Sequence, residues 1–231
     1  MFSIIIPTYN ERINIEILIP KIAETLNGHD YEIIVVDDSS PDGTAKAAEN
    51  LADKFPIRVI VRPEKLGLAS AVVEGFKVAN GKYIGIIDAD LQHPPEYITE
   101  FAHYVQNGHD IVIGSRYISG GRIEAWSIFR TIISRGAIML SRPLTNVKDP
   151  VSGYFFMKRE VIEEILFYPQ GFKILLEILI KGKYNNIKEI PLVFKMRGNG
   201  DSKLNTHECL NYLKLLSHLY GYKLKGKIHG R

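Results

Sequence analysis

Short apolar runs alternate with longer segments of helical periodicity through the first half of the chain. The apolar runs are too short to form helices and end at polar residues, which is typical of buried strands. We predict strands at Phe2–Ile6, Glu32–Val36, Ile57–Val61, Tyr83–Ile87 and Asp110–Ile113. We predict helices between them at Arg12–Asn27, Gly43–Lys54, Leu66–Asn80 and Pro95–Gln106. This alternation predicts an α/β fold with a mainly parallel central sheet and helices on both faces.

Polar and charged side chains follow each predicted strand. In such a sheet, ligands gather beyond the carboxyl ends of the strands. The strand Tyr83–Ile87 stops at Asp88 and Asp90. An acidic triplet is common in solvated turns, but at a strand end it favours a divalent cation with oxygen ligands, Mg²⁺ or Mn²⁺, which also bridges to phosphate. His93 could approach the same ion, but a lone histidine before a Pro-Pro helix start is more often a supporting residue.

The motifs that usually cradle phosphate with backbone are missing from the sequence. The first strand–helix turn, residues 7–11, has no Gly-x-Gly-x-x-Gly, and the chain has no Gly-x-x-x-x-Gly-Lys-Ser/Thr. Phosphate charge must therefore be met by the metal and by arginine or lysine side chains.

Residues 122–142 change the pattern, because tryptophan and isoleucine are interleaved with arginine. This composition fits an amphipathic helix lying in a membrane interface, although the same helix could simply complete the core. Arg130 and Ser134 are four residues apart and are expected on one helix face.

Three further elements are predicted toward the end of the chain. They are an amphipathic helix at Gly171–Lys181, a strand at Ile187–Phe194 and a last helix at His207–Gly221. Leu210, Leu213, Leu216 and Leu219 recur every third residue in the last helix and predict one apolar face. Residues 195–203 form a basic, glycine-containing loop, with the composition of a lid over phosphates or of an ordinary surface loop.

Composition narrows the class of protein. The 231 residues carry a formal charge of +3, too mild to indicate a nucleic-acid partner, and 45% of them are hydrophobic, ample for a large core. Cys209 is the only cysteine, which excludes an intrachain disulfide and favours an intracellular protein. We expect a C-terminal amphipathic helix with a basic tail at residues 205–231. The basic residues there suit an anionic membrane surface or phosphorylated ligands, or form a solvated helix face.

Four motifs of the first half resemble the family-2 glycosyltransferases, which have the GT-A nucleotide-sugar fold. They are Ile6–Glu11, Val35–Ser40, Asp88–Pro95 and Gly114–Tyr117. Three later motifs resemble the dolichol-phosphate mannose synthases within that family: Asp149–Phe155, Gly171–Leu179 and Gly200–Leu204. The resemblance covers about residues 2–204 in order, and it implies a GT-A catalytic domain at residues 1–204 that includes the amphipathic segment at about residues 122–142.

The resemblance implies a role for each matching position. The nucleoside pocket would contain Pro7, Tyr9, Glu11, Val36 and Asp38. The metal and the sugar diphosphate would be bound by Asp88, Ala89, Asp90 and Gln92, with Asp88, Asp90 and Gln92 as metal ligands. Arg116 would belong to the donor site, Arg130 and Ser134 to the acceptor phosphate, and Arg197 and Lys203 to a closing loop over the donor. The residues expected to act in catalysis are Asp90, Arg116 and Arg130.

The implied reaction is an inverting transfer of mannose from GDP-mannose to dolichyl or another polyprenyl phosphate. A phosphate monoester, with a second pKa of about 6, is already ionised at neutral pH, so no general base is needed. The alternatives keep the fold and use UDP-glucose or a polysaccharide acceptor, or retain the fold in a non-catalytic membrane-docking subunit. Because no segment is long enough to span a bilayer, we expect peripheral attachment to the cytoplasmic face of a membrane, through amphipathic helices or a separate membrane subunit.

Overall fold

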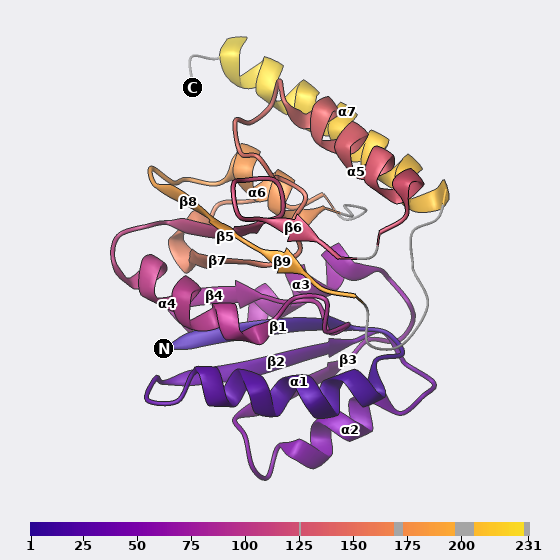
Figure 1. Ribbon diagram of the computed structural model, residues 1–231, viewed down its shortest axis with the longest axis vertical. Helices are drawn as coiled ribbons and strands as arrows, with labels where there is room; N and C mark the ends of the chain where they lie inside the picture. The colour runs from indigo at the N-terminus through magenta and orange to yellow at the C-terminus, as the bar shows by residue number, and fades with distance from the viewer. Residues whose placement is uncertain (125, 169–172, 197–205, 229–231) are drawn as a thin grey trace.

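A seven-stranded sheet runs through the protein in this computed structural model, which describes residues 1–124, 126–168, 173–196 and 206–228 (Figure 1). Its strands are β1 (Phe2–Thr8), β2 (Tyr31–Asp37), β3 (Ile57–Val61), β4 (Tyr83–Ile86), β5 (Ile111–Ser115), β7 (Phe155–Lys158) and β8 (Ile187–Pro191). Their order is β3-β2-β1-β4-β7-β5-β8, and only β7 runs antiparallel to its neighbours. The predicted mainly parallel α/β sheet is therefore confirmed.

Strand residues alternate between two cores, one on each face of the sheet. Ile4 of β1 belongs to the core under helices α1 (Arg12–Thr25), α2 (Thr44–Leu51) and α4 (Ile98–Gln106), which follows the short turn η1 (Pro95–Tyr97). Ile5 belongs to the opposite core, under α3 (Leu68–Val78) and α6 (Ile174–Lys181). The period of two is the reason that these apolar runs form a sheet covered on both faces.

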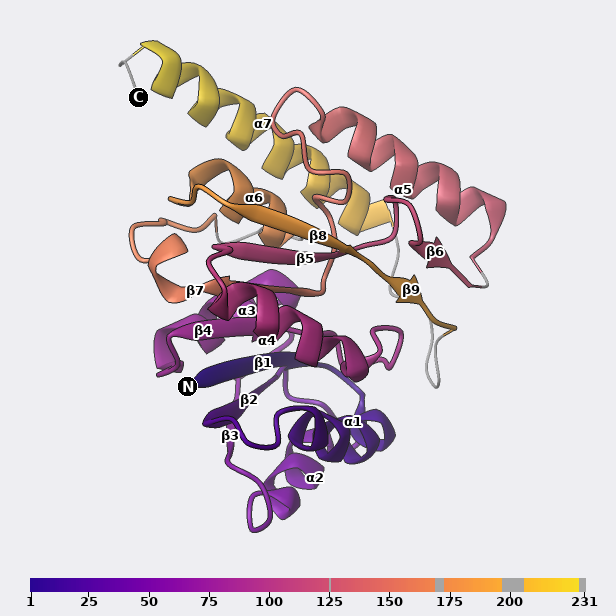
Figure 2. The same ribbon diagram turned by 60° about the vertical axis from the view of Figure 1, so that its left-hand side comes forward.

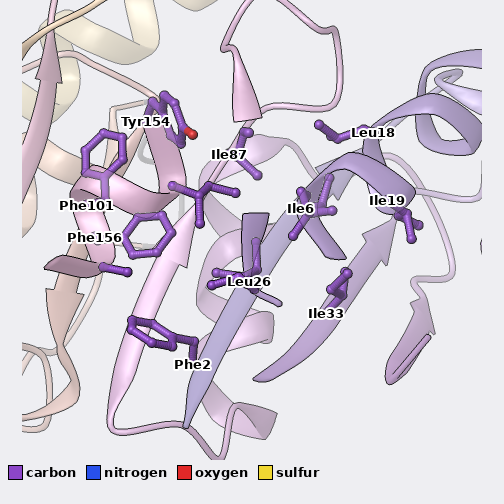
Figure 3. Packing of buried hydrophobic residues seen from close by; sticks show 14 of the residues in the cluster. Phe2, Ile6, Leu18, Ile19, Leu26, Ile33, Ile87, Phe101, Tyr154 and Phe156 are labelled. Atoms are coloured by element: carbon purple, nitrogen blue, oxygen red, sulfur yellow. The ribbon is translucent and has the colours of Figure 1, made fainter. Parts of the chain in front are cut away.

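An aromatic cluster fills the first core around β7 (Figure 3). The Phe101 ring lies 4.6 Å from that of Tyr154 and 5.1 Å from that of Phe156, measured between centroids. Gly85 in the middle of β4 makes this possible, because a β-carbon there would lie 2.4 Å from the Phe156 ring. A glycine usually weakens a strand, but here it allows a large ring to pack against the backbone.

The antiparallel strand β7 determines which loop reaches the carboxyl edge of the sheet. Its first residue, Phe155, pairs with Ile86 near the end of β4 and with Ile113 in β5. Since β7 begins where its neighbours end, the preceding residues 149–154 lie beside the residues that follow β4 and β5. This placement brings a distant sequence motif to Asp88 and Arg116.

Two long helices form a separate layer above the sheet. Helices α5 (Ile128–Ser141) and α7 (Thr206–Ile228) lie side by side in both views (Figures 1 and 2). The Tyr212 and Tyr220 hydroxyls of α7 donate to the carbonyl oxygens of Ala137 and Leu140 in α5, over 2.6 and 2.7 Å. Because the partners advance together along both helices, the pair is parallel.

Three local expectations from the sequence were wrong. The strand predicted at Ile187–Phe194 divides into β8 and β9 (Val193–Phe194), and β9 pairs with β6 (Arg122–Ile123) in a second, two-stranded sheet. The helix predicted to be amphipathic, α6, is instead buried on nearly all sides, and its Glu177 is paired with Lys181 over 2.5 Å. Burial of an acidic residue is possible because of that pair.

The third error concerns the leucines of α7. Leu216 and Leu219 are buried against α6, whereas Leu210 and Leu213 are 58% and 50% exposed. A three-residue spacing turns by about 300° per step, so positions nine residues apart face opposite directions. The buried face consists instead of Tyr212, Leu215, Leu216 and Leu219.

The division of the chain at residue 204 stays a prediction. Helix α7 packs against α5 and α6 in a small core of its own with Ile138, Leu144 and Val151. In the described part of the chain, no helix has the length and hydropathy needed to cross a bilayer.

Candidate active site

A cavity of about 610 Å³ opens at the carboxyl edge of the sheet, within the size range of ligand pockets. Most of the residues predicted for the site line it: Pro7, Tyr9, Glu11, Asp38, Asp88, Ala89, Asp90, Gln92, Arg116, Arg130 and Ser134. Val36 is the exception, because its side chain is fully buried in the core between the sheet and α3. Arg197 and Lys203 lie outside the described residues.

Backbone strain is concentrated at this edge. Among the described residues, the non-glycine positions with positive φ are Asn10, Ser39 and Leu91, at 57°, 53° and 61°. They follow β1, β2 and β4. Such conformations cost of order 1–3 kcal/mol each and persist where the surrounding structure enforces them, frequently at functional sites. Three of them at one edge make this edge the candidate for a functional site.

Asp88 and Asp90 are held in place by their surroundings. The Asp88 carboxylate packs against the bare backbone of Gly153, where a β-carbon would lie 2.5 Å from Oδ2. Asp90 Oδ1 accepts the Gln92 backbone N–H over 3.1 Å, across the strained Leu91. The Gln92 side-chain amide donates to the Lys195 carbonyl over 3.1 Å, which leaves its oxygen as the remaining acceptor.

The donor set fits a hard divalent cation that is completed by substrate. Asp88 and Asp90 supply carboxylate oxygens and Gln92 an amide oxygen. In the described part of the chain, no group of three or more histidine, cysteine or acidic side chains could hold a metal alone. Mg²⁺ and Mn²⁺ are commonly held by one or two carboxylates together with substrate phosphates, which is the arrangement that these residues allow.

His93 supports this site from below as a neutral ring. It is buried between Tyr154 and Phe194, with its Nδ1 3.5 Å from Asp88 Oδ2. Burial, together with smaller contributions from the positive charges of Arg116 and Lys173, lowers the pKa of His93 to about 3. His93 therefore packs under Asp88 without adding charge at neutral pH.

Asp38 fixes a loop of the cavity wall. Its Oδ1 accepts from Arg62 Nε over 2.6 Å, and its Oδ2 accepts the backbone N–H groups of Leu66 and Gly67 over 3.1 and 2.9 Å. Both carboxylate oxygens are thus engaged by residues 62–67. Lys65 of that loop lies 4.0 Å above the Tyr9 ring and lines the cavity, so it joins the nucleoside end of the predicted site.

Arg116 is locked in a buried ion pair. Its Nε and Nη2 donate to the two oxygens of Asp149 over 2.7 and 2.8 Å, and its backbone N–H donates to Oδ2 over 3.0 Å. Burial lowers the pKa of Arg116, but the Asp149 charge and hydrogen bonds outweigh it and raise the pKa overall. The sequence predicts that this arginine binds phosphate. In the structure, two of its guanidinium N–H groups already donate to Asp149.

Arg130 and Ser134 share the cavity-facing side of α5, as their spacing predicts. The Ser127 hydroxyl caps the helix by accepting the Arg130 N–H over 3.2 Å. The hydroxyl groups of Ser134 and Tyr117 are 2.8 Å apart. Arg130 therefore lies in the first turn of a capped helix, close to the carboxyl edge of the sheet.

The cavity has an apolar wall that the sequence did not predict as part of the site. It is formed by Ile133, Ala137 and Leu140 of α5 together with Tyr212 and Leu213 of α7. The sequence also did not assign Lys173, Trp126 or Ser152 to the site, although all three line it. Lys173 and Ser152 belong to motifs that carry the family resemblance, and that membership could have indicated their place in the site. The pairing of α5 with α7 had no signal in the local sequence.

A mainly parallel sheet with flanking helices and a polar cavity at its carboxyl edge is the arrangement of the GT-A fold. Residues 3–166 match the family model described as Glycosyl transferase family 2. The chain belongs to this family.

Two similar proteins from different organisms carry the same name. The chain is 50% identical over 94% of its length to "Dolichol-phosphate mannosyltransferase" of Pyrococcus furiosus and spans 62% of that relative. It is 37% identical over 96% of its length to the protein of that name from Saccharomyces cerevisiae, of which it spans 88%. The resemblance to this group is therefore confirmed.

Solved structures show the same fold. Glucosyl-3-phosphoglycerate synthase from Mycobacterium tuberculosis, in complex with Mn²⁺, UDP-glucose and phosphoglyceric acid, matches with a TM-score of 0.70 at 21% identity. The match covers 95% of this chain and 79% of that one. At this identity the comparison shows the fold alone.

Proposed function

We propose that this protein transfers mannose from GDP-mannose to dolichyl or another polyprenyl phosphate, giving dolichyl β-D-mannosyl phosphate and GDP. The observation that carries the proposal is the composition of a single cavity. Paired carboxylates line it at the carboxyl edge of the sheet, and apolar side chains of α5 and α7 line it beneath the helix pair. A polar donor and a lipid-linked phosphate need these two environments in one site. The names of the similar proteins support mannose transfer to dolichyl phosphate.

Asp88, Asp90 and Gln92 would hold Mg²⁺ or Mn²⁺ against the donor. When bound, the ion neutralises negative charge that develops on the leaving diphosphate. Gly153 and His93 keep Asp88 in position by contact. Tyr9, Glu11 and Lys65 would surround the nucleoside at the end of β1.

Arg130 and Ser134 would bind the acceptor phosphate. This phosphate is largely ionised at neutral pH, with a second pKa of about 6, so the chain needs cationic and hydroxyl donors there and no base. Arg116, whose charge is balanced by Asp149, would help to orient the donor in the same cavity. A single in-line displacement at the anomeric carbon inverts its configuration.

The outer surface of α5 and α7 would hold the protein on a membrane. Ile128, Ile132 and Met139 of α5 are 82%, 62% and 71% exposed, and Leu210 of α7 is 58% exposed. Apolar side chains beside basic residues favour an interfacial helix. We expect attachment at the cytoplasmic face, alone or with a separate membrane-anchoring subunit.

Transfer from radiolabelled GDP-mannose and UDP-glucose to dolichyl phosphate in detergent tests the proposal directly. We expect mannose transfer with added Mg²⁺ or Mn²⁺ and little glucose transfer. Glucose transfer alone would assign the UDP-glucose alternative. Absence of transfer from either donor, with no Mn²⁺-dependent GDP binding by calorimetry, would indicate a non-catalytic docking subunit.

A further inference from the structure

Trp126 contacts both arginines that we place at the phosphates. The Arg130 guanidinium carbon lies 4.4 Å from the centroid of the Trp126 ring, and that of Arg116 lies 5.3 Å from it. Cations within about 6 Å of an indole are attracted by the negative face of the ring. Trp126 itself lines the cavity.

The small second sheet also contacts the indole ring. Phe194 of β9 meets the Trp126 ring edge-on at 5.4 Å between centroids. Strand β9 pairs with β6, which ends three residues before Trp126. The sheet and the capped start of α5 therefore hold the ring where α5 enters the site.

Hydrogen bonding does not explain the position of Trp126. Its Nε1 is buried and has no hydrogen-bond partner among the residues that the structure describes. Buried donors are nearly always paired, so an unpaired one indicates that other contacts determine the position of the side chain. The contacts present are ring contacts with Phe194, Arg116 and Arg130.

We propose that Trp126 is a positioning residue for acceptor binding, because the face of its indole ring holds the Arg130 guanidinium in place for the acceptor phosphate. Arg116 already has Asp149 to hold it, through two side-chain hydrogen bonds. This inference rests on the proposed function for the identity of the phosphate.

Two substitutions separate the ring from the rest of the side chain. Trp126→Phe keeps an aromatic face, and it loses no hydrogen bond to the described part of the chain, since Nε1 makes none there. Trp126→Leu keeps an apolar side chain and removes the face. Calorimetry with farnesyl phosphate, a short water-soluble polyprenyl phosphate, measures acceptor binding, and GDP with Mn²⁺ measures donor binding.

For Trp126→Leu we expect the Kd of farnesyl phosphate to rise about tenfold, or about 1.4 kcal/mol. Trp126→Phe should stay within about threefold, and GDP binding within about twofold in both. Equal loss in the two variants, no loss in Trp126→Leu, or a matching loss of GDP binding would overturn the inference. The last result would show a merely structural role.

Trp126 also reports on its own surroundings, because it is the only tryptophan in the chain. Saturating farnesyl phosphate should change its fluorescence in the wild type, and Arg130→Ala should remove that change. An unchanged emission at saturation established by calorimetry would contradict the inference. Both measurements are made without turnover, so a failed mannose-transfer assay would count against the proposed function and leave this result standing.

Discussion

A β-carbon on Gly153 would lie 2.5 Å from the Oδ2 atom of Asp88. The two residues are 65 positions apart in the chain, yet the carboxylate at the end of β4 has its place only because Gly153 has no side chain. The loop that carries Gly153 reaches Asp88 because β7 is antiparallel.

Gly153→Ala should therefore reduce transfer by displacing a predicted metal ligand. We expect a fall of about 10- to 100-fold, as for other residues that support metal ligands, with the fold retained by circular dichroism. Gly221→Ala in α7 is the matched control, since a β-carbon there meets nothing within 4 Å. That variant should keep its activity and gain up to about 1 kcal/mol in helix stability. Full activity in Gly153→Ala would show that transfer does not depend on the position of Asp88.

Asp90→Asn should abolish transfer and leave the melting temperature nearly unchanged. The substitution keeps the side-chain oxygen that accepts the Gln92 N–H but removes the charge that would bind Mg²⁺ or Mn²⁺. We expect at least about 100-fold lower activity and a loss of the Mn²⁺-dependent part of GDP binding, measured by calorimetry. Retained turnover at ordinary metal concentrations would refute the metal assignment.

Arg130→Ala should weaken use of the lipid phosphate much more than binding of GDP. Loss of a charge-assisted contact of about 1.5–3 kcal/mol raises the KM for the acceptor by roughly 10- to 100-fold. Arg135→Ala is the control, because Arg135 lies on the same helix but is exposed. Steady-state kinetics with each substrate varied checks both. If Arg130→Ala lost GDP and acceptor affinity equally, the arginine would belong to the donor half of the site.

The carboxylate of Asp110 should contribute stability at neutral pH that is lost in acid. Burial raises the pKa of Asp110, but hydrogen bonds from Lys158, Asn185 and Asn186 outweigh it and lower the pKa below its usual value of about 3.8. The folded state therefore favours the charged form, and the stabilisation is present above pH about 4 and disappears as the pH falls through the folded pKa.

Asp110→Asn should accordingly reduce the free energy of unfolding by about 1–3 kcal/mol at pH 7, measured in urea. The difference from the wild type should shrink as the pH falls below about 4. Glu160→Gln provides the control, because Glu160 is 66% exposed and its oxygen is 3.9 Å from Lys158. It should change stability by less than about 0.5 kcal/mol. A difference that is constant with pH would contradict the lowered pKa.

Replacing Ile132 and Met139 together by serine should weaken binding to lipid vesicles. Both side chains are largely exposed on α5, so the folded protein loses little core packing. Removing two large apolar side chains from a membrane contact lowers the partition coefficient by roughly tenfold or more, measurable by vesicle sedimentation. Leu166→Ser tests specificity, since Leu166 is 89% exposed and lies outside α5 and α7. If the wild type, the double variant and Leu166→Ser bound vesicles equally, the pair of helices α5 and α7 would have no role in membrane binding.

The order of strands and helices in the first half was predictable from the chain because the signal is local. Ile57–Val61 forms a strand with the predicted bounds, and most other elements differ by one to four residues at their ends. Successive apolar residues of a strand point to opposite faces of the sheet, so both faces must be covered, whichever helices cover them. The clustering of Asp88, Asp90 and Arg116 followed from the rule that parallel strands end at one edge.

Contacts between distant segments could not be predicted in this way. Nothing local shows that Asp149 would occupy two N–H groups of Arg116, or that Val36 would face the core instead of the cavity. The leucine spacing in α7 misled because a true helical face repeats at 3.6 residues and is selected by the partner helix.

The sequence by itself determined the α/β class, the family and the positions of the carboxylates, because these depend on periodicity and on short motifs at strand ends. The tertiary structure alone decided how the site is completed. An antiparallel β7 brings Gly153 and Asp149 to Asp88 and Arg116, and the packing of α7 on α5 supplies the apolar wall of the cavity. Those contacts join residues tens of positions apart, and their energies exist only after the chain has folded.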